Sequence, residues 1–257
     1  MAVRCSTVCV HDQLLVPRPG SFEFDISKVS QLPLSVGLPG TASLDNYVVG
    51  PNAQAVDAVR ALVEGVGPRL LYLWGRSGTG KTHLAQAVCR HVTRTGGRCA
   101  FVPFGSDEEF TPALLEGLET VTLACIDDLH CVAGQAGWER ALFNLYNEAE
   151  RTSVRLLLTG SSSISASAFG LQDLRSRFAS ILAYQLHELD ERERETAVRL
   201  RAEERGFEIP REVADYLMRR YPRSMHELIG LVEKLDHSTL AAQRRVTIPF
   251  VKSLLDV

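Results

Sequence analysis

A glycine-rich stretch between two contrasting segments constrains the fold of this chain more than any other feature. Residues 75–82 read GRSGTGKT and stand between the apolar run RLLYLWG and the segment KTHLAQAVCRHVTRTGG. The run is typical of a buried strand, and the following segment of a helix that ends at Gly96 and Gly97. The pattern Gly-x-x-x-x-Gly-Lys-Thr in this setting predicts a phosphate-binding loop, because its glycines let backbone N–H groups point at phosphate oxygens near a helix N-terminus.

Every residue of this loop is a candidate for nucleotide binding. Lys81 is expected to reach the β- and γ-phosphates, and the Thr82 hydroxyl to hold Mg²⁺. The other candidates are Gly75, Arg76, Ser77, Gly78, Thr79 and Gly80. The sequence therefore predicts ATP or ADP, with Mg²⁺, as cofactors. The alternative is a glycine turn that merely precedes an ordinary helix.

Two aspartates end another apolar run, TVTLACIDD at residues 120–128. Asp127 is expected to hold Mg²⁺ through water, and Asp128 to orient or polarise an attacking water. A helix cap or a solvated turn is the alternative for this pair. Because Asp is one methylene shorter than Glu, we expect Asp128 to support only slow hydrolysis. An intrinsic ATPase activity is therefore predicted to be weak or absent.

Two further segments carry candidate nucleotide contacts. Hydroxyls end the apolar run LLLTGSS, and either Thr159 or Ser161 is a candidate to lie near the γ-phosphate. The alternative for both is a hydroxyl turn that leaves a strand. The segment SMHELIGLVEKLD begins with a capping box and has His226 in its first helical turn. His226 is therefore expected to be either neutral and surface-facing or close to a nucleotide phosphate, and Arg223, just before the cap, is an alternative phosphate contact.

Strand and helix patterns alternate along the middle of the chain, and helices alone follow. Over residues 41–188 the alternation predicts an α/β unit, with a parallel sheet covered by helices on both faces. Residues 189–257 read as four helices that form a smaller, all-helical subdomain. Residues 1–40 show no sustained periodicity and contain four prolines, so we expect a flexible arm there.

Composition excludes several classes of protein. The formal net charge is −3, whereas a protein that binds DNA mainly through its own surface is usually basic. No apolar run has the roughly 20 residues that a membrane helix needs, and the first residues lack the apolar core of a secretory signal. The six cysteines are spaced neither as a redox pair nor as a zinc framework, and Cys125 is expected to be a small core residue. We therefore expect a cytoplasmic protein without membrane association.

Several segments together resemble the AAA+ core of the bacterial DnaA-related proteins. They are NYVVGPNAQAV, LYLWGRSGTGKTHLAQAV, LACIDDLH, LLLTGS, LRSRF, SMHELIGLVEKLD and TIPFV. The resemblance covers residues 29–257 and is closer still to the Hda group, which regulates the replication initiator DnaA. It implies an AAA+ P-loop NTPase fold with a helical lid, and it adds Val49 to the nucleotide contacts. It also aligns His226 with the sensor-2 arginine of initiators, Ser161 with an acidic residue and Asp173 with an arginine.

The resemblance implies that the main activity is exerted on DnaA. Arg177 aligns with an arginine finger that completes the site of ATP bound to DnaA, so that this ATP is hydrolysed and over-initiation of replication is prevented. In the Hda group the regulator itself typically holds ADP. A possible homo-oligomer is also in keeping with an AAA+ protein.

The resemblance also implies a second partner, the sliding clamp of DNA polymerase III. Within residues 29–38, the segment that resembles the clamp-docking peptide of the Hda group consists of Gln31, Leu32, Pro33, Leu34 and Ser35. An extended peptide that contains proline loses little entropy on binding, which favours this interpretation. DNA would then be reached only through the clamp. The alternative is a strap that packs back onto the domain.

Other functions remain open at this point. A helicase-loader-like ATPase would assemble strongly and be stimulated by DNA, but it leaves the QLPLS peptide without a role. Initiators continue past the segment that resembles TIPFV into a helix-turn-helix domain, so an initiator paralogue is disfavoured. A small-molecule kinase is the least favoured alternative, because no acceptor pocket is evident in the helical part.

Overall fold

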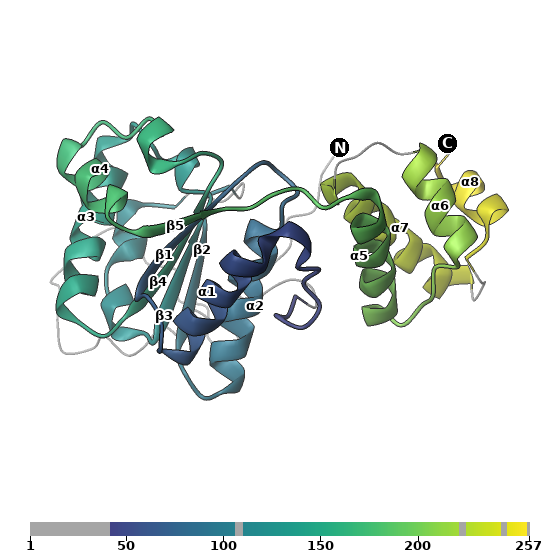
Figure 1. The fold of residues 1–257 in the computed structure, drawn as a ribbon, viewed down its shortest axis with the longest axis horizontal. Helices are drawn as coiled ribbons and strands as arrows, with labels where there is room; N and C mark the ends of the chain where they lie inside the picture. Colours follow the sequence, from purple (N-terminus) through teal and green to yellow (C-terminus); the bar gives the residue numbers. More distant parts are fainter. Residues whose placement is uncertain (1–41, 106–109, 221–224, 243–245, 256–257) are drawn as a thin grey trace, which may run out of the picture. The chain divides into compact units, whose positions relative to one another are not determined.

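The computed structural model describes residues 42–105, 110–220, 225–242 and 246–255 (Figure 1). In these residues a parallel sheet has the strand order β2-β3-β4-β1-β5. The strands are β1 (Leu70–Trp74), β2 (Cys99–Pro103), β3 (Leu123–Asp127), β4 (Arg155–Gly160) and β5 (Leu182–Gln185). Because β1 lies between β4 and β5, the glycine-rich loop after β1 begins beside the carboxyl ends of two other strands.

Helices cover both faces of this sheet (Figure 1). α1 (Ala53–Glu64) and α2 (Lys81–Arg94) pack on one face, and α3 (Ala136–Arg151) and α4 (Gln172–Ala179) on the other. Short 3₁₀ helices lie in the connections: η2 (Gly50–Asn52), η3 (Pro112–Leu115), η4 (Leu118–Thr120), η5 (Leu129–Cys131) and η6 (Ile164–Ala166). Because all of these strand pairs are parallel, each strand is joined to the next by a crossover connection.

The interior strand β3, which lies between β2 and β4, shows why its sequence is an uninterrupted apolar run. All of its residues are buried. Leu123 and Cys125 belong to the core beneath α1 and α2, whereas Ala124 and Ile126 belong to the core beneath α3 and α4. A strand that is covered on both faces has no polar side, so alternation is lost and only the charge at its end, Asp127, interrupts the pattern.

Four helices follow the sheet: α5 (Glu191–Glu204), α6 (Arg211–Arg220), α7 (Met225–Ala242) and α8 (Ile248–Leu255). They share a core of their own that includes Val198, Val213 and Val232. α5 begins with a capping box in which the Asp190 N–H donates to Glu193 Oε2 and the Glu193 N–H donates to Asp190 Oδ1, each at 2.8 Å. The predicted fold class, a parallel sheet flanked by helices and followed by an all-helical part, is confirmed.

A buried carboxylate joins three loop positions near α3 and α4. Glu139 is 2% exposed, although it lies on a helix whose other buried residues are apolar or aromatic. Its side chain accepts hydrogen bonds from the N–H groups of Gly134 at 2.7 Å, Gly170 at 2.9 Å and Leu171 at 2.6 Å. Burial raises the pKa of Glu139, but these three donors outweigh it and lower the pKa overall. Glu139 is not among the residues predicted from the sequence.

Some predictions fall outside the described residues. They concern the arm of residues 1–40, including the QLPLS peptide, Arg223, and the side chain of His226, whose backbone lies in α7. In the part of the chain that the structure describes, no helix combines the length and the apolar character that crossing a membrane requires.

Candidate nucleotide-binding site

The loop between β1 and α2 requires its glycines. A Cβ atom on Gly75 would lie 2.5 Å from the carbonyl oxygen of Leu186, and the Gly75 N–H donates to the carbonyl oxygen of Gly160 at 3.2 Å. Gly78 and Gly80 have φ angles of 82° and 91°, a region that residues with side chains rarely adopt. The spacing of glycines seen in the sequence therefore reflects both crowding at the strand end and left-handed backbone in the loop.

Lys81 is the first residue of α2, and its side chain is buried in this loop. Its Nζ atom donates to the carbonyl oxygens of Gly75 at 2.8 Å and Arg76 at 2.9 Å. Burial lowers the pKa of Lys81, and the charges of Asp128 and Asp127 act in the opposite direction. The ammonium group therefore lies against the loop backbone, where the motif requires a cation for phosphate binding.

Asp127 lies at the end of β3 between two hydroxyl donors. Thr82 Oγ1 donates to Asp127 Oδ2 at 2.7 Å, and Thr159 Oγ1 donates to Asp127 Oδ1 at 2.5 Å. Asp127 is 2% exposed, so burial raises its pKa, while the hydrogen bonds from Thr159 and Thr82 lower it. A carboxylate paired with a threonine hydroxyl is an oxygen-donor set of the kind that Mg²⁺ prefers, and these residues fit that ion.

Asp128 has a backbone conformation unlike that of its neighbour. Its φ angle is 58°, and in the described residues it is the one non-glycine residue with a positive φ. Its N–H donates to Thr159 Oγ1 at 2.9 Å, and a Cβ atom on Gly105 would lie 2.8 Å from Asp128 Oδ2. Strained backbone of this kind is often found at functional sites, where a side chain must point in an unusual direction.

Thr159 joins the two aspartates, whereas Ser161 does not. The Thr159 hydroxyl donates to the Asp127 carboxylate and accepts from the Asp128 N–H, and Thr159 is fully buried. Ser161 lies in a bend after β4 and is exposed. Of the two hydroxyl candidates, Thr159 is therefore the one that the fold brings to the acidic pair.

The segment before α1 covers part of the loop. Tyr47 Oη donates to the carbonyl oxygen of Thr79 at 3.1 Å, and a Cβ atom on Gly80 would lie 2.5 Å from the Tyr47 ring. Burial raises the pKa of Tyr47 to about 12, so the hydroxyl stays protonated as a donor. Val49, the residue chosen from the resemblance, directly precedes η2, and its carbonyl oxygen accepts from the Asn52 N–H at 2.9 Å.

Asn52 anchors the same segment to the residues that follow β5. Its Nδ2 donates to the carbonyl oxygen of His187 at 3.1 Å, and its Oδ1 accepts from the His187 N–H at 2.8 Å. Sequence reasoning missed Tyr47 and Asn52. The signal that the sequence offered is the segment NYVVGPN, in which Tyr47 and Asn52 stand on either side of Val49.

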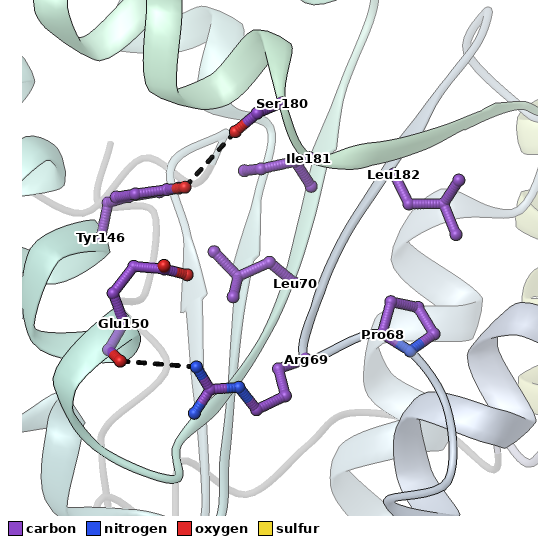
Figure 2. A pocket seen from close by; sticks show the side chains of 8 residues that line it. All are labelled: Pro68, Arg69, Leu70, Tyr146, Glu150, Ser180, Ile181 and Leu182. Carbon is purple, nitrogen blue, oxygen red and sulfur yellow. Dashed lines mark hydrogen bonds between the residues drawn. The ribbon is translucent and has the colours of Figure 1, made fainter.

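Arg177 lies apart from these groups, on α4. It is exposed, and its guanidinium carbon lies 5.8 Å from the centroid of the Tyr146 ring on α3. Tyr146 also lines a small surface pocket of about 230 Å³ with Leu70 and Leu182, the first residues of β1 and β5 (Figure 2). The phosphate loop leaves the opposite, carboxyl end of β1, so this pocket is distinct from the candidate nucleotide site.

A parallel sheet with this strand order, a Gly-Lys-Thr loop after β1 and an acidic strand end beside it define a P-loop NTPase fold of the AAA+ class. Residues 38–185 match the family described as the bacterial DnaA ATPase domain, and residues 190–255 match the Hda lid domain. The chain belongs to the DnaA-related family of AAA+ proteins.

Solved structures with similar folds include initiators and a DNA motor. Domain III of the Thermotoga maritima replication initiation protein DnaA is 25% identical, with 84% of this chain and 95% of that chain covered and a TM-score of 0.71. AMPPCP-bound DnaA from Aquifex aeolicus is 23% identical, with coverages of 75% and 64% and a TM-score of 0.62. The Thermotoga maritima RuvB Holliday junction branch migration motor is 16% identical, with coverages of 84% and 72% and a TM-score of 0.61.

Proposed function

We propose that this protein is a nucleotide-bound regulator that stimulates hydrolysis of the ATP carried by DnaA and thereby inactivates the initiator. The observation that carries the proposal is the separation of two features within a DnaA-related fold. The phosphate-type loop that would hold the chain's own nucleotide follows β1, while Arg177 is exposed on a different element, α4. An arginine presented in this way is suited to act on the nucleotide of another molecule.

The chain's own site is proposed to hold ADP or ATP with Mg²⁺. Gly75 to Gly80 would surround the phosphates with backbone N–H groups, Lys81 would contact them directly, and Thr82 with Asp127 would hold the ion. Bound Mg²⁺ neutralises phosphate charge. Val49 and His226 are proposed as further nucleotide contacts, and Thr159, with Ser161 as the weaker candidate, as the group that senses the γ-phosphate.

Intrinsic turnover in this site is proposed to be slow. The Asp127 carboxylate already accepts two hydroxyl hydrogen bonds, and Asp128, the candidate for orienting water, has a shorter side chain than a glutamate would. Nucleotide would then serve mainly to hold the protein in its active conformation. Stimulated hydrolysis would take place on DnaA, where the guanidinium of Arg177 stabilises charge that develops on the γ-phosphate.

The remaining assignments complete the proposal. Residues 1–40 would form an arm, and Gln31 to Ser35 within it would bind the sliding clamp. Residues 41–188 would form the nucleotide-binding subdomain, and residues 189–257 would form the lid. The net charge of −3 supports contact with DNA through the clamp rather than directly. The protein would act in the cytoplasm, where replication initiates.

The test follows labelled ATP bound to DnaA after addition of this protein, ADP and clamp loaded on DNA. We expect hydrolysis that depends on the clamp and is lost in Arg177→Ala and in Gln31→Ala/Leu32→Ala. Arg175→Ala is the matched control, because Arg175 is an exposed arginine on the same helix. If the wild-type chain gives no stimulation but hydrolyses ATP itself when DNA is added, the regulator is excluded in favour of a loader-type ATPase.

A further inference from the structure

Three cysteines that are far apart in the sequence meet beneath α2. Cys89 lies on α2, Cys99 is the first residue of β2, and Cys125 lies within β3. Their sulfur atoms all lie within 4.8 Å of one another, and the Sγ atoms of Cys89 and Cys99 are 2.8 Å apart. The register explains the meeting, because Cys99 pairs with Leu123 and Phe101 with Cys125, so both strands direct their cysteines to the face that α2 covers.

The three thiols differ in access. Cys89 is 2% exposed and Cys125 fully buried, whereas Cys99 is partly exposed at the edge of the same apolar core. Hydrogen bonds with the Cys125 and Cys89 thiols lower the pKa of Cys99, while burial raises the pKa of Cys125. Cys99 is therefore the thiol that combines solvent access with thiolate character, which together govern cysteine reactivity.

The apolar surroundings of the three thiols favour an uncharged disulfide over a complex of three thiolates with a metal ion. Three thiolates around a divalent ion would leave a net negative charge in an apolar core, and Asp127 adds a like charge near Cys89. A disulfide carries no charge and needs only two of the three sulfur atoms. The Sγ atoms of Cys89 and Cys99 are already 2.8 Å apart, and Cys99 is the accessible thiol, so these two residues are the pair we consider.

We propose that Cys99 and Cys89 form a disulfide when the protein meets a peroxide. The Cys99 thiolate attacks one oxygen of hydrogen peroxide, forming a sulfenic acid and releasing hydroxide, which takes up the proton that Cys99 lost on ionising. The Cys89 thiol then attacks the Cys99 sulfur, the S–S bond forms, and the sulfenic oxygen leaves as water. Two thiols are oxidised, one peroxide is reduced, and two waters are released.

The bond would tie the last half of α2 to β2. It closes a short loop that contains Gly96, where a Cβ atom would meet nothing within 4 Å, and Gly97, where a Cβ atom would lie 2.7 Å from the Val92 side chain. A cross-link across a short loop restricts the unfolded chain, so we expect the unfolding midpoint to rise by several degrees on oxidation. Because α2 begins at Lys81 and Thr82, the same bond restrains the helix that carries the phosphate-contacting residues.

The test uses the full chain with Cys5, Cys9 and Cys131 replaced by Ser, so that only the three clustered thiols remain. After treatment with hydrogen peroxide, free thiols are alkylated and the chain is cut after Arg and Glu, which separates the three cysteines onto three peptides. We expect one cross-linked species that joins the Cys89 and Cys99 peptides, has lost two hydrogen atoms and is reversed by dithiothreitol.

Variants and alternative products keep the proposal falsifiable. Cys125→Ala should leave the cross-link in place, whereas Cys99→Ser should abolish it, and the parent protein alone suffices if a variant fails to fold. A cross-link that involves Cys125, an irreversible sulfinic acid on Cys99, or complete alkylation of all three thiols would each overturn the proposed pair. The assay does not involve DnaA or the clamp, so its outcome is independent of the proposed function.

Discussion

The phosphate-loop edge of the sheet and the helix α4 present their candidate functional residues in opposite ways. At the loop edge, Lys81 and Asp127 are buried and each has two hydrogen-bond contacts to neighbouring groups. On α4, Arg177 is exposed and stacks on one aromatic ring. Groups that act on a ligand held by the same chain gain from being fixed in advance, whereas a group that acts on another molecule must first be reachable.

The largest expected effect concerns Arg177, the exposed residue in this comparison. Arg177→Ala should reduce stimulated hydrolysis of DnaA-bound ATP by about 10³-fold, because an arginine finger contributes roughly that factor. Affinity for the chain's own ADP should change less than about twofold, since Arg177 lies on α4 and not in the phosphate loop. Single-turnover hydrolysis and ADP titration measure the two quantities. A parallel loss of both would mean that Arg177 supports the chain's own site.

The next largest effect concerns the buried residues at the phosphate-loop edge of the sheet. Lys81→Ala should weaken ADP binding by about 10²-fold, because it removes a charged hydrogen-bond donor to phosphate. Calorimetric titration with ADP gives the dissociation constant. Lys252→Ala is the matched control, since that lysine lies on α8 against the Tyr216 ring and should leave binding unchanged. An equal loss in both variants would contradict a specific phosphate contact.

A third prediction concerns the carboxylate that supports α4. Glu139→Gln should lower the free energy of unfolding by about 2 kcal/mol, because a charged acceptor of three buried N–H groups is replaced by a neutral amide with fewer acceptor positions. The pKa of Glu139 is lowered by folding, so its contribution is present above the ordinary glutamate pKa and is lost as the pH falls through the folded value. Urea unfolding at several pH values measures both.

For this carboxylate, the wild type and Glu139→Gln should differ most at neutral pH and converge in acid. A difference in stability that stays constant down to the lowest pH at which both proteins fold would show that the lost interaction is not electrostatic.

The smallest effect sharpens the picture of the loop edge. Tyr47→Phe removes the hydrogen bond to the Thr79 carbonyl but keeps the ring that packs on Gly80, so we expect a loss of about 1 kcal/mol, or roughly fivefold, in ADP affinity. Tyr216→Phe, on α6 in the all-helical part, serves as the control. An unchanged affinity in Tyr47→Phe would mean that the ring alone supports the loop.

Sequence reasoning was most successful where the signal is local. The glycines, Lys81 and Thr82 are adjacent in the chain, and the strand before them and the helix after them are read from the same short segment. The fold class followed from the alternation of apolar runs and amphipathic segments. Whether these residues bind nucleotide, and whether Arg177 acts on DnaA, stay predictions.

What the sequence did not reveal depends on contacts between distant segments. Asn52 meets His187 across 135 positions, and Glu139 meets Gly170 across 31. The spacing of the cysteines suggested no shared site, yet strand register and helix packing bring three of them together. Such contacts follow from how parallel strands are ordered, and a periodic pattern within one segment carries no information about that order.

Glu139 supports the start of α4 in a way that leaves the exposed side chains of this helix free to change during evolution. Among the described residues, the hydrogen bonds of its carboxylate are to main-chain N–H groups, so this support of α4 does not depend on the side chains that the helix exposes. Exposed positions such as Gln172, Asp173 and Ser176 can therefore vary while the position of Arg177 on α4 is kept. If α4 contacts DnaA as proposed, substitutions on its exposed face would change that contact and leave the support of the helix unchanged.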